Sequence, residues 1–301
     1  MVSAQKRIAA VLVAFDRDEF LKRALQHTVN QSRQCNSVIV VDNANLESTR
    51  QIVNDFHAIY ISGSLDNGSA GGFALGINYA IENNHDYVWT LDDDGYPDQK
   101  CLEELMEVMN ELHLDVTSPL SLSQEDFSQT ANPYLFGFRK ITSAADIQKE
   151  RFWLGKVQFY NGMLLSKKII DLIGLPKKEL FLRGDEMDYF YRAKSTSLGM
   201  ALATRALFYH PSGVPEFANS RNSILGVVMP KDEKKKYYQF RNRGYLIREY
   251  GLFVNGLYDW IRYPIFFLIL PGKNFLGFKE WRRLWIQGFK KDLKPFESRK
   301  N

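Results

Sequence analysis

In the first third of the chain, short apolar runs rich in Val and Ile alternate with segments of helix-forming residues. The runs are continuously apolar, which is typical of strands that are buried on both faces. Predicted strands lie at 8–15, 37–42, 58–62 and 87–91, and predicted helices lie between them at 19–30, 47–56 and 72–83. Strands and helices that alternate in this way form βαβ units. We therefore predict a Rossmann-like α/β fold with a mostly parallel central sheet.

Polar residues follow three of the predicted strands directly. They are Asp16 and Arg17 after the first strand, Asp42 and Asn43 after the second, and Asp92, Asp93 and Asp94 after the fourth. In open α/β sheets, ligands bind beyond the carboxyl ends of the strands. We therefore predict that the functional site lies at this edge.

The three consecutive aspartates need a positive charge nearby, because carboxylates this close repel one another and raise each other's pKa. A divalent metal would relieve the repulsion, and Mg²⁺ or Mn²⁺ prefers such oxygen ligands. Alternate residues of an extended backbone point the same way, so Asp92 and Asp94 can face one pocket while Asp93 faces elsewhere. A solvated acidic turn, or a helix cap before Pro97, is the alternative explanation.

Composition narrows the class of protein. With 45% hydrophobic and 25% charged residues, the chain resembles globular proteins and neither disordered nor fibrous ones. Cys35 and Cys101 lie far apart and suggest neither a disulfide framework nor a metal site. No continuous apolar run reaches the length of about 18 residues that a membrane span needs. The N-terminus runs into the first strand without a small-residue cleavage site, so we expect a cytoplasmic protein.

Charge is distributed unevenly along the chain. From Lys231 to the end there are 17 Lys and Arg against 7 Asp and Glu, whereas the first 230 residues hold 22 against 28. A basic C-terminal region on a mildly acidic body predicts contact with something anionic, either phospholipid or nucleic acid. No recognised nucleic-acid-binding module accompanies the basic residues, so we expect no nucleic-acid partner.

The alternation of predicted strands and helices weakens after the fourth predicted strand and returns further along the chain. The stretch from Ser121 to Arg151 has little periodicity and is predicted to be a variable loop region. A strand-like segment follows at 157–168, with a short helix at 169–173. The next predicted helix, at 185–194, begins with several carboxylates, which suit the positive end of a helix dipole. A further strand at 200–209 is closed by His210.

These motifs resemble the inverting glycosyltransferases of family 2, which have the A-type fold. In chain order they are VAFDR, VIVVDNAN, NGSAGGFALGINYA, WTLDDDGYP and FLRGDEMDYFYR, followed by the strand that ends in His210. The resemblance covers about Ile8 to Pro211, and the segment YYQFRNRGY at 237–245 is similar to the tail of that family. The NGSAGGF loop and the LDDDG cluster look most like the bacterial galactofuranosyltransferases and rhamnosyltransferases. Asp16 stands where Asn is commoner, and Glu186 stands where Asp is often the base.

The resemblance implies a domain organisation. A catalytic domain of the A-type fold would span 1–230, with a nucleotide-sugar half at about 1–120 and an acceptor half at about 121–230. A basic amphipathic helical extension at 231–301 would follow it.

The resemblance also implies the parts of a donor site. Asp92, Asp94 and His210 would hold Mn²⁺ or Mg²⁺, which compensates the charge of the departing diphosphate. The implied donor-binding residues are Phe15, Arg17, Asp42, Asn67, Gly71, Gly72, Asp92 and Asp93. Asp42 could accept hydrogen bonds from a pyrimidine base or ribose, and Arg17 could reach base or phosphate, although capping of the strand end also explains Asp42. The glycines of the loop permit close approach of an anion to the backbone, and a tight turn would explain them as well.

Inversion at the anomeric carbon needs a carboxylate that takes the proton of the acceptor hydroxyl. When the GDEMD run is matched to the family's motif, Glu186 is the implied base and Asp185 contacts the acceptor. Asp188 would support the helix and the backbone. Capping of the helix by all three carboxylates is the alternative. Trp153 is a further acceptor candidate, although tryptophans in this setting are more often part of a core.

The C-terminal region has the pattern of a helix at a membrane interface. Between Lys279 and Phe296, aromatic and aliphatic residues fall near one face of a predicted helix, namely Trp281, Leu284, Trp285 and Phe289. Basic residues occupy the remainder of this helix. Such helices bind anionic lipid, so we predict a peripheral protein on the inner face of the cell membrane. A helix packed on the catalytic domain, with a solvated basic side, is the alternative.

These expectations combine into one leading function. The chain is predicted to be an inverting, metal-dependent transferase that moves galactofuranose from UDP-galactofuranose onto a glycan or polyprenyl-linked acceptor of a bacterial surface polysaccharide. Rhamnosyl transfer from dTDP-rhamnose is the second enzymatic candidate. A non-catalytic nucleotide-sugar-binding module is disfavoured by the retained acidic residues. A nucleotidyltransferase is disfavoured because the expected basic, Gly-rich loop is missing.

Overall fold

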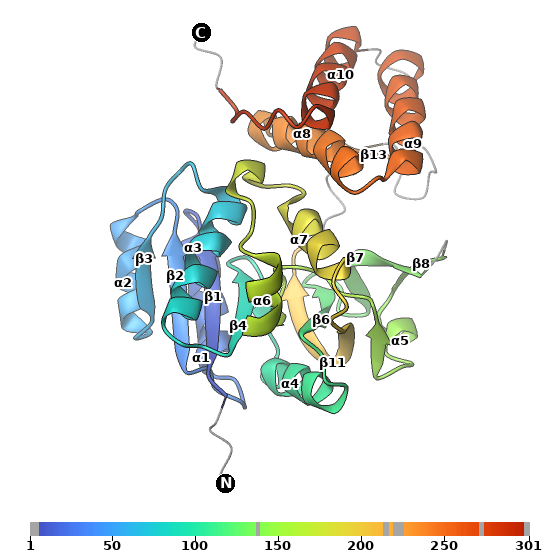
Figure 1. Ribbon diagram of the computed structural model, residues 1–301. Coiled ribbons are helices and arrows are strands. Elements are labelled where there is room, and N and C mark those ends of the chain that lie inside the picture. The colour runs from blue at the N-terminus through green and yellow to red at the C-terminus, as the bar shows by residue number, and fades with distance from the viewer. Residues whose placement is uncertain (1–5, 137–138, 213–216, 219–225, 271–273, 298–301) are drawn as a thin grey trace. The chain divides into compact units, whose positions relative to one another are not determined.

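The computed structural model describes residues 6–136, 139–212, 217–218, 226–270 and 274–297 (Figure 1). The chain divides into two compact units. The first, called here the sheet unit, comprises Met1–Pro176 and Tyr189–Ser212. The second, the helical unit, comprises Lys177–Asp188 and Gly213–Asn301.

Eleven strands in the described residues form one sheet. The central order is β3 (Ile59–Ser62), β2 (Ser37–Asp42), β1 (Ile8–Ala14), β4 (Tyr87–Asp92), β10 (Met163–Ser166), β6 (Val116–Ser123), β11 (Met200–His210) and β5 (Tyr96–Pro97). Four of the seven pairings along this order are parallel. β10 is antiparallel to both β4 and β6, and β5 is antiparallel to β11. The predicted α/β class with a mostly parallel sheet is confirmed.

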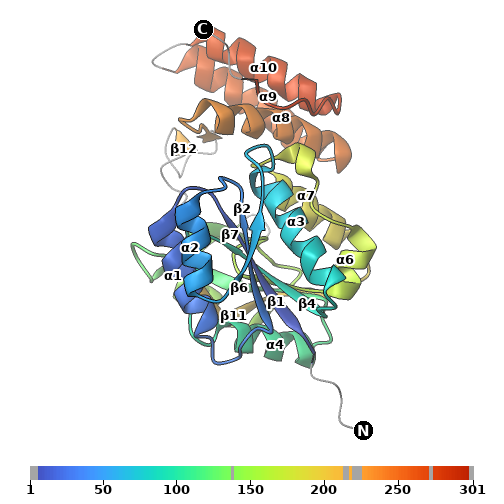
Figure 2. The same ribbon diagram turned by 90° about the vertical axis from the view of Figure 1, so that its left-hand side faces the viewer.

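The continuously apolar β1 is buried because helices cover both faces of the sheet (Figure 2). Ile8, Ala10, Leu12 and Ala14 belong to one core cluster, and Ala9, Val11 and Val13 belong to the other. On the first face lie α1 (Asp18–Val29), α2 (Glu47–Asp55) and α4 (Cys101–Glu111). On the second lie α3 (Gly68–Glu82), α6 (Lys167–Ile173) and the end of α7 (Asp185–Lys194).

The described part of the segment from Ser121 to Arg151 forms strands and a short helix, so the prediction of a variable loop region was wrong. It holds β7 (Gln129–Phe136), which pairs with β6, and β8 (Arg139–Ser143), which pairs with β7. A short helix, α5 (Ala144–Ile147), follows, and β9 (Phe152–Leu154) pairs with β11. Burial along β7 does not alternate regularly, which explains why the sequence shows no strand period there. The predicted strand at 157–168 is shorter than expected and corresponds to β10 alone.

The helical unit is built on three helices, α8 (Glu233–Glu249), α9 (Phe253–Pro264) and α10 (Phe275–Phe289). A π-helical turn, η3 (Ile265–Ile269), continues α9, and the short strands β12 (Phe217–Ala218) and β13 (Val227–Val228) form a hairpin. The backbones of α8 and α10 are in direct contact. A Cβ at Gly244 would lie 2.0 Å from the carbonyl oxygen of Trp285, and one at Gly288 would lie 1.7 Å from that of Arg241. Glycine is therefore required at both positions.

The aromatic face of α10 is part of the core of the helical unit. Trp281, Leu284 and Trp285 are only 1%, 0% and 6% exposed. Trp281 and Trp285 contact the ring of Trp260 in α9. The prediction that these side chains anchor the protein in a membrane interface was wrong, because an apolar helix face looks the same in sequence whether protein or lipid covers it. In the described part of the chain, no helix is long and apolar enough to cross a membrane.

Candidate active site

The carboxyl ends of β1, β2 and β4 lie side by side at one edge of the sheet. β1 runs parallel to both neighbours, and the register pairs Ala14 with Asp42 and Val13 with Asp92. The polar residues that follow these strands therefore come together, as the sequence pattern predicts. This edge of the sheet unit carries the candidate site.

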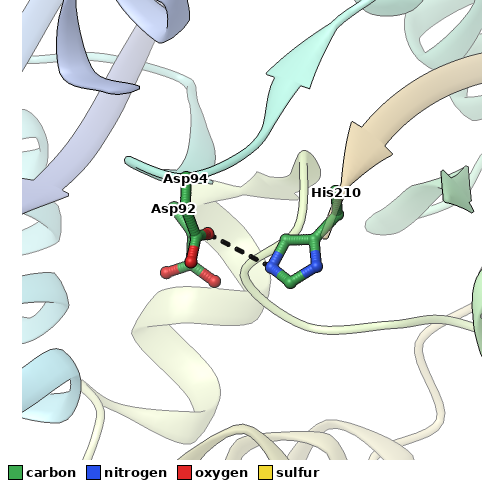
Figure 3. A group of neighbouring side chains, drawn as sticks. All are labelled: Asp92, Asp94 and His210. Carbon is green, nitrogen blue, oxygen red and sulfur yellow. Dashed lines mark ion pairs between the residues drawn. The ribbon is translucent and has the colours of Figure 1, made fainter. Parts of the chain in front are cut away.

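Asp92, Asp94 and His210 lie close enough to hold a metal ion. Each offers one ligand atom, and these atoms all lie within 4.8 Å of one another. The two aspartates come from the end of β4 and His210 comes from the end of β11 (Figure 3). β4 and β11 are separated by β10 and β6 in the sheet, so it is the tertiary fold that brings His210 to the aspartates.

The chemistry of this group fits the predicted cation. Asp94 Oδ1 is buried without a hydrogen bond and lies 3.2 Å from His210 Nε2, as an ion pair. His210 Nδ1 lies 2.8 Å from the carbonyl oxygen of Pro211 and can donate to it, which leaves Nε2 toward Asp94. Such a hydrogen bond fixes the tautomer and the orientation of a metal-binding imidazole. Two carboxylates and one oriented imidazole are a suitable ligand set for Mn²⁺.

The charges of Asp94 and His210 stabilise each other. Burial by itself raises the pKa of Asp94, but His210 and Arg17 outweigh it, so the pKa of Asp94 is well below its usual range. Burial likewise opposes a proton on His210, but Asp94 outweighs it and the pKa of His210 is raised. The two groups therefore favour a carboxylate beside a protonated imidazole, and a metal ion would compete with that proton.

Arg17, which was predicted to lie at this edge, supplies a positive charge to Asp93 and Asp94, a pairing that was not predicted. Its guanidinium donates to Asp93 Oδ1 and to Asp94 Oδ2. Asp93 is only 1% exposed and also accepts the backbone N–H of Phe15 at 3.1 Å. Burial raises the pKa of Asp93 to about 7 even though Arg17 lowers it. Asp93 is not part of the group of Asp92, Asp94 and His210, and it ties the end of β1 to the end of β4.

Asp42 has internal partners for both carboxylate oxygens. It is fully buried and accepts hydrogen bonds from the backbone N–H groups of Ala44 and Leu46, both at 2.9 Å, and from the hydroxyl of Tyr60 at 3.1 Å. In this structure Asp42 holds the loop after β2, as in the capping alternative. A contact between Asp42 and a nucleotide stays a prediction.

The glycine-rich loop opens α3 and packs tightly against the chain itself. A Cβ at Gly72 would lie 2.6 Å from Val13 Cγ1, and one at Gly71 would lie 2.8 Å from Asn67 Cβ. Asn67 and the loop are held by Asn43, which donates to the carbonyl oxygen of Gly68 at 2.8 Å and accepts from Asn67 at 3.3 Å. Gly72 lets α3 approach β1 and Gly71 leaves room for the Asn67 side chain, so packing alone accounts for both. Their predicted contact with the donor is not tested.

The acidic run of α7 lies in the helical unit at residues 185–188. Asp188 is fully buried, and its carboxylate accepts hydrogen bonds from Tyr250 at 2.7 Å and from Tyr245 at 3.3 Å. Asp185 is 2% exposed. Glu186 is half-buried and accepts the backbone N–H of Gly184 at 2.9 Å through Oε2. Of the three carboxylates, Glu186 is the most accessible, whereas Asp188 has a structural role.

The loop before this run is held by α8, which sequence reasoning missed. Asn242 Nδ2 donates to the carbonyl oxygens of Leu180, Leu182 and Arg183 at 2.8, 2.9 and 2.9 Å. Asn242 and its neighbour Arg241 are fully buried, and Arg241 donates to the carbonyl oxygen of Glu179 at 2.6 Å.

The backbone of this loop has unusual angles. Phe181, Arg183 and Gly184 have φ angles of 66°, 65° and 108°. The first two values are unfavourable for residues with a side chain, so the hydrogen bonds from α8 stabilise a strained loop. The sequence signal for this contact was the segment at 237–245, which is similar to the tail of the family but for which no role was predicted.

Trp153 lies in β9, within a small core cluster of the sheet unit. Its indole N–H donates to the carbonyl oxygen of Ile147 at 2.9 Å, and its ring contacts that of Phe136. The side chain is half-buried. These contacts account for Trp153 without an acceptor, and its predicted acceptor contact is not tested.

Comparison with known proteins agrees with this geometry. The family model for glycosyl transferase family 2 matches residues 9–173. Galactofuranosyltransferase GlfT1 of Mycolicibacterium smegmatis is 32% identical over 286 residues, which cover 92% of this chain and 94% of that protein. GlfT1 of Mycobacterium tuberculosis strain H37Rv is 30% identical over 285 residues, and hexosyltransferase Agl10 of Haloferax volcanii is 23% identical over 241 residues.

Solved structures show the same fold. Residues 1–349 of TarS from S. aureus align with a TM-score of 0.59 and 14% identity, covering 95% of this chain and 82% of that one. GalNAc-T7 with UDP, GalNAc and Mn²⁺ aligns with a TM-score of 0.61 and 10% identity, covering 97% of this chain and 58% of that one. The expected A-type glycosyltransferase fold is thereby confirmed. The chain belongs to glycosyl transferase family 2.

Proposed function

We propose that this glycosyltransferase transfers galactofuranose, with inversion, from UDP-galactofuranose to a glycan or polyprenyl-linked acceptor of a surface polysaccharide. The observation that carries the proposal is the group of Asp92, Asp94 and His210 at the carboxyl edge of the sheet. The choice of galactofuranose rests on identity to galactofuranosyltransferases over nearly the whole chain. We further propose that the protein works at the cytoplasmic face of the membrane, where a lipid-linked acceptor would be available.

Asp92, Asp94 and His210 would hold Mn²⁺ or Mg²⁺ together with the diphosphate of the donor. When bound, this ion would supply the positive charge that a departing nucleoside diphosphate needs. Arg17 keeps the Asp94 carboxylate ionised and fixes its direction through Oδ2, which leaves Oδ1 for His210 or the ion. The pairing of Arg17 with Asp93 holds the ends of β1 and β4 together, so the two metal-binding carboxylates do not need to move on binding.

Glu186 is the proposed base. The acceptor oxygen would form a bond to the anomeric carbon as the bond from that carbon to the diphosphate breaks, and the acceptor proton would pass to the Glu186 carboxylate. Its Oε2 already accepts a hydrogen bond from Gly184, so Oε1 would receive the proton. Asp185, one residue before it, is proposed to contact the acceptor.

The test is a screen of nucleotide sugars for release of nucleoside diphosphate, with Mn²⁺ or Mg²⁺ and with EDTA. UDP-galactofuranose with a soluble acceptor analogue should release UDP, and EDTA should abolish the release. Release from dTDP-rhamnose instead would assign the rhamnosyl donor. If no nucleotide sugar is consumed although the protein binds UDP, the chain is a binding module and the transferase proposal fails.

A further inference from the structure

Seven exposed large apolar side chains lie within the described part of residues 253–276 of the helical unit. They lie on α9, on η3 and at the start of α10, and their exposed fractions are 55% for Phe253, 84% for Val254, 66% for Leu257, 47% for Ile261, 69% for Ile269, 58% for Phe275 and 76% for Leu276. A group of this kind on a water-soluble unit marks an interaction surface, because water is a poor neighbour for so much apolar area.

On α9 these side chains form one continuous face. Phe253, Val254, Leu257 and Ile261 are spaced so that they fall within about a third of the helix circumference. The opposite face is buried and includes Gly256, Asp259 and Tyr263. Packing in the helical unit therefore covers one side of α9 and leaves its apolar side exposed.

Charge is absent from the exposed face of α9. The two charged residues of this helix are Asp259 and Arg262, and they pair with each other at 2.8 Å. Asp259 also pairs with Arg243 of α8 at 2.7 Å and is fully buried. The ion pairs of α9 therefore lie inside the helical unit, and the exposed face of this helix carries no charged residue.

The exposed side of α10 is basic directly after its apolar first turn. Lys279, Arg282 and Arg283 are exposed and follow Phe275 by four, seven and eight residues, so all share one helix face. Lys279 lies over the ring of Phe275, with 4.7 Å between its Nζ and the ring centroid. The single acidic residue of α10, Glu280, pairs with Lys236 at 3.5 Å. Apolar side chains next to exposed cations are the pattern of a surface for anionic lipid.

We propose that the helical unit binds an anionic bilayer through the apolar face of α9, with η3 and the first turn of α10, while Lys279, Arg282 and Arg283 contact lipid headgroups. This surface differs from the aromatic face of α10 predicted from the sequence, which is buried. A second copy of the chain is a poorer occupant, because a two-fold contact through the start of α10 would bring its own cations together. The surface serves the proposed function, since it would keep the enzyme beside a lipid-linked acceptor.

The test is co-sedimentation of the full chain with vesicles of phosphatidylcholine, alone or mixed with phosphatidylglycerol, in the absence of donor. The wild type should bind the mixed vesicles, and Leu257→Glu should weaken this binding by about tenfold or more, because it places a carboxylate among the inserted side chains. Leu172→Glu is the matched control, because Leu172 in α6 of the sheet unit is 62% exposed. Leu257→Ser supplies a second, uncharged variant.

The proposed contact of the basic residues with lipid headgroups is tested by a variant that carries both Arg282→Glu and Arg283→Glu. This pair should abolish the preference for phosphatidylglycerol, whereas Arg205→Glu on the exposed side of β11 should not. If the wild type binds neither vesicle, or if Leu257→Glu and Leu172→Glu behave alike, the proposal is overturned. A concentration-dependent dimer that Leu257→Glu dissociates, without vesicle binding, would assign the face to a second copy. The result is independent of the transferase proposal, which UDP release with a soluble acceptor measures separately.

Discussion

Tyr250 donates a hydrogen bond from its hydroxyl group to the carboxylate of Asp188 over 2.7 Å. Asp188 is fully buried and Tyr245 and Lys177 also approach it, at 3.3 and 3.4 Å. A carboxylate in this setting connects the start of α7 to the end of α8 and has no free access to an acceptor. This contact therefore distinguishes Asp188 from the half-buried Glu186, which is the proposed base.

The first prediction distinguishes the base from its neighbour. Glu186→Gln keeps the hydrogen bond with Gly184 and the side-chain volume but cannot take a proton, so kcat should fall by about 10²–10⁴. The donor KM should hardly change. Asp188→Asn should instead lower the free energy of unfolding, by about 1–3 kcal/mol, because a buried acceptor of several hydrogen bonds loses its charge. Steady-state kinetics and urea unfolding of both variants check this. A folded Asp188→Asn protein without turnover, beside an active Glu186→Gln protein, would show that Asp188 is the base.

The second prediction concerns the loop that Asn242 holds. Asn242→Ala removes the donor to three carbonyl groups and should lower the free energy of unfolding by about 1–3 kcal/mol, because each of these groups loses a hydrogen bond. Asn110→Ala is the matched control, since Asn110 lies on an exposed position of α4 and should cost much less. Equal unfolding midpoints of the two variants in urea would contradict a stabilising role for Asn242.

The third prediction concerns the metal group. Asp94→Asn removes one proposed ligand, and binding of Mn²⁺ to the donor-free protein should weaken by about tenfold or more. Titration calorimetry with MnCl₂ measures this without turnover, and His210→Ala should have the same effect. Asp126→Asn, at an exposed carboxylate of the β6–β7 loop, should leave the affinity unchanged. Wild-type turnover that persists in EDTA would show that the group has another role.

The fourth prediction is a pH dependence of stability that arises at His85. Its imidazole is 2% exposed and lies within hydrogen-bond distance of the carbonyl oxygen of Ala80 and the hydroxyl of Ser37, at 2.9 and 3.0 Å. Burial lowers the pKa of His85 from 6.5, so the unfolded chain takes up a proton that the folded protein resists. The contribution of His85 to the free energy of unfolding should therefore be complete above pH 6.5 and should decline as the pH falls below it.

The check is urea unfolding above and below that pH. His85→Gln should make the midpoint less dependent on pH, whereas His57→Gln, at an exposed position, should not. Burial also lowers the pKa of His27, so part of the slope will remain in the His85 variant. An unchanged slope in His85→Gln would contradict this assignment.

The sequence by itself determined the sheet and the edge where the site lies. The predicted strand at 37–42 coincides with β2, and the other three predicted strands differ from β1, β3 and β4 by one residue, because a strand buried on both faces must be apolar throughout. The position of Asp92–Asp94 after such a strand was enough to place them at the carboxyl edge. The link to His210 came from the family resemblance alone, since it depends on a sheet order that local sequence does not encode.

Only the tertiary structure decided which partners these residues have. Arg17 neutralises Asp93 and Asp94 because β1 lies beside β4, and α8 holds the loop before Glu186 through contacts that span about 60 positions. The aromatic stripe of α10 and the apolar stripe of α9 are equivalent as sequence patterns. They differ in burial because Trp281 and Trp285 of α10 pack against Trp260 of α9, whereas Phe253, Val254 and Leu257 lie on the exposed face of α9. Hydrophobic periodicity identifies a face that must be covered, but what covers it depends on the packing of the whole chain.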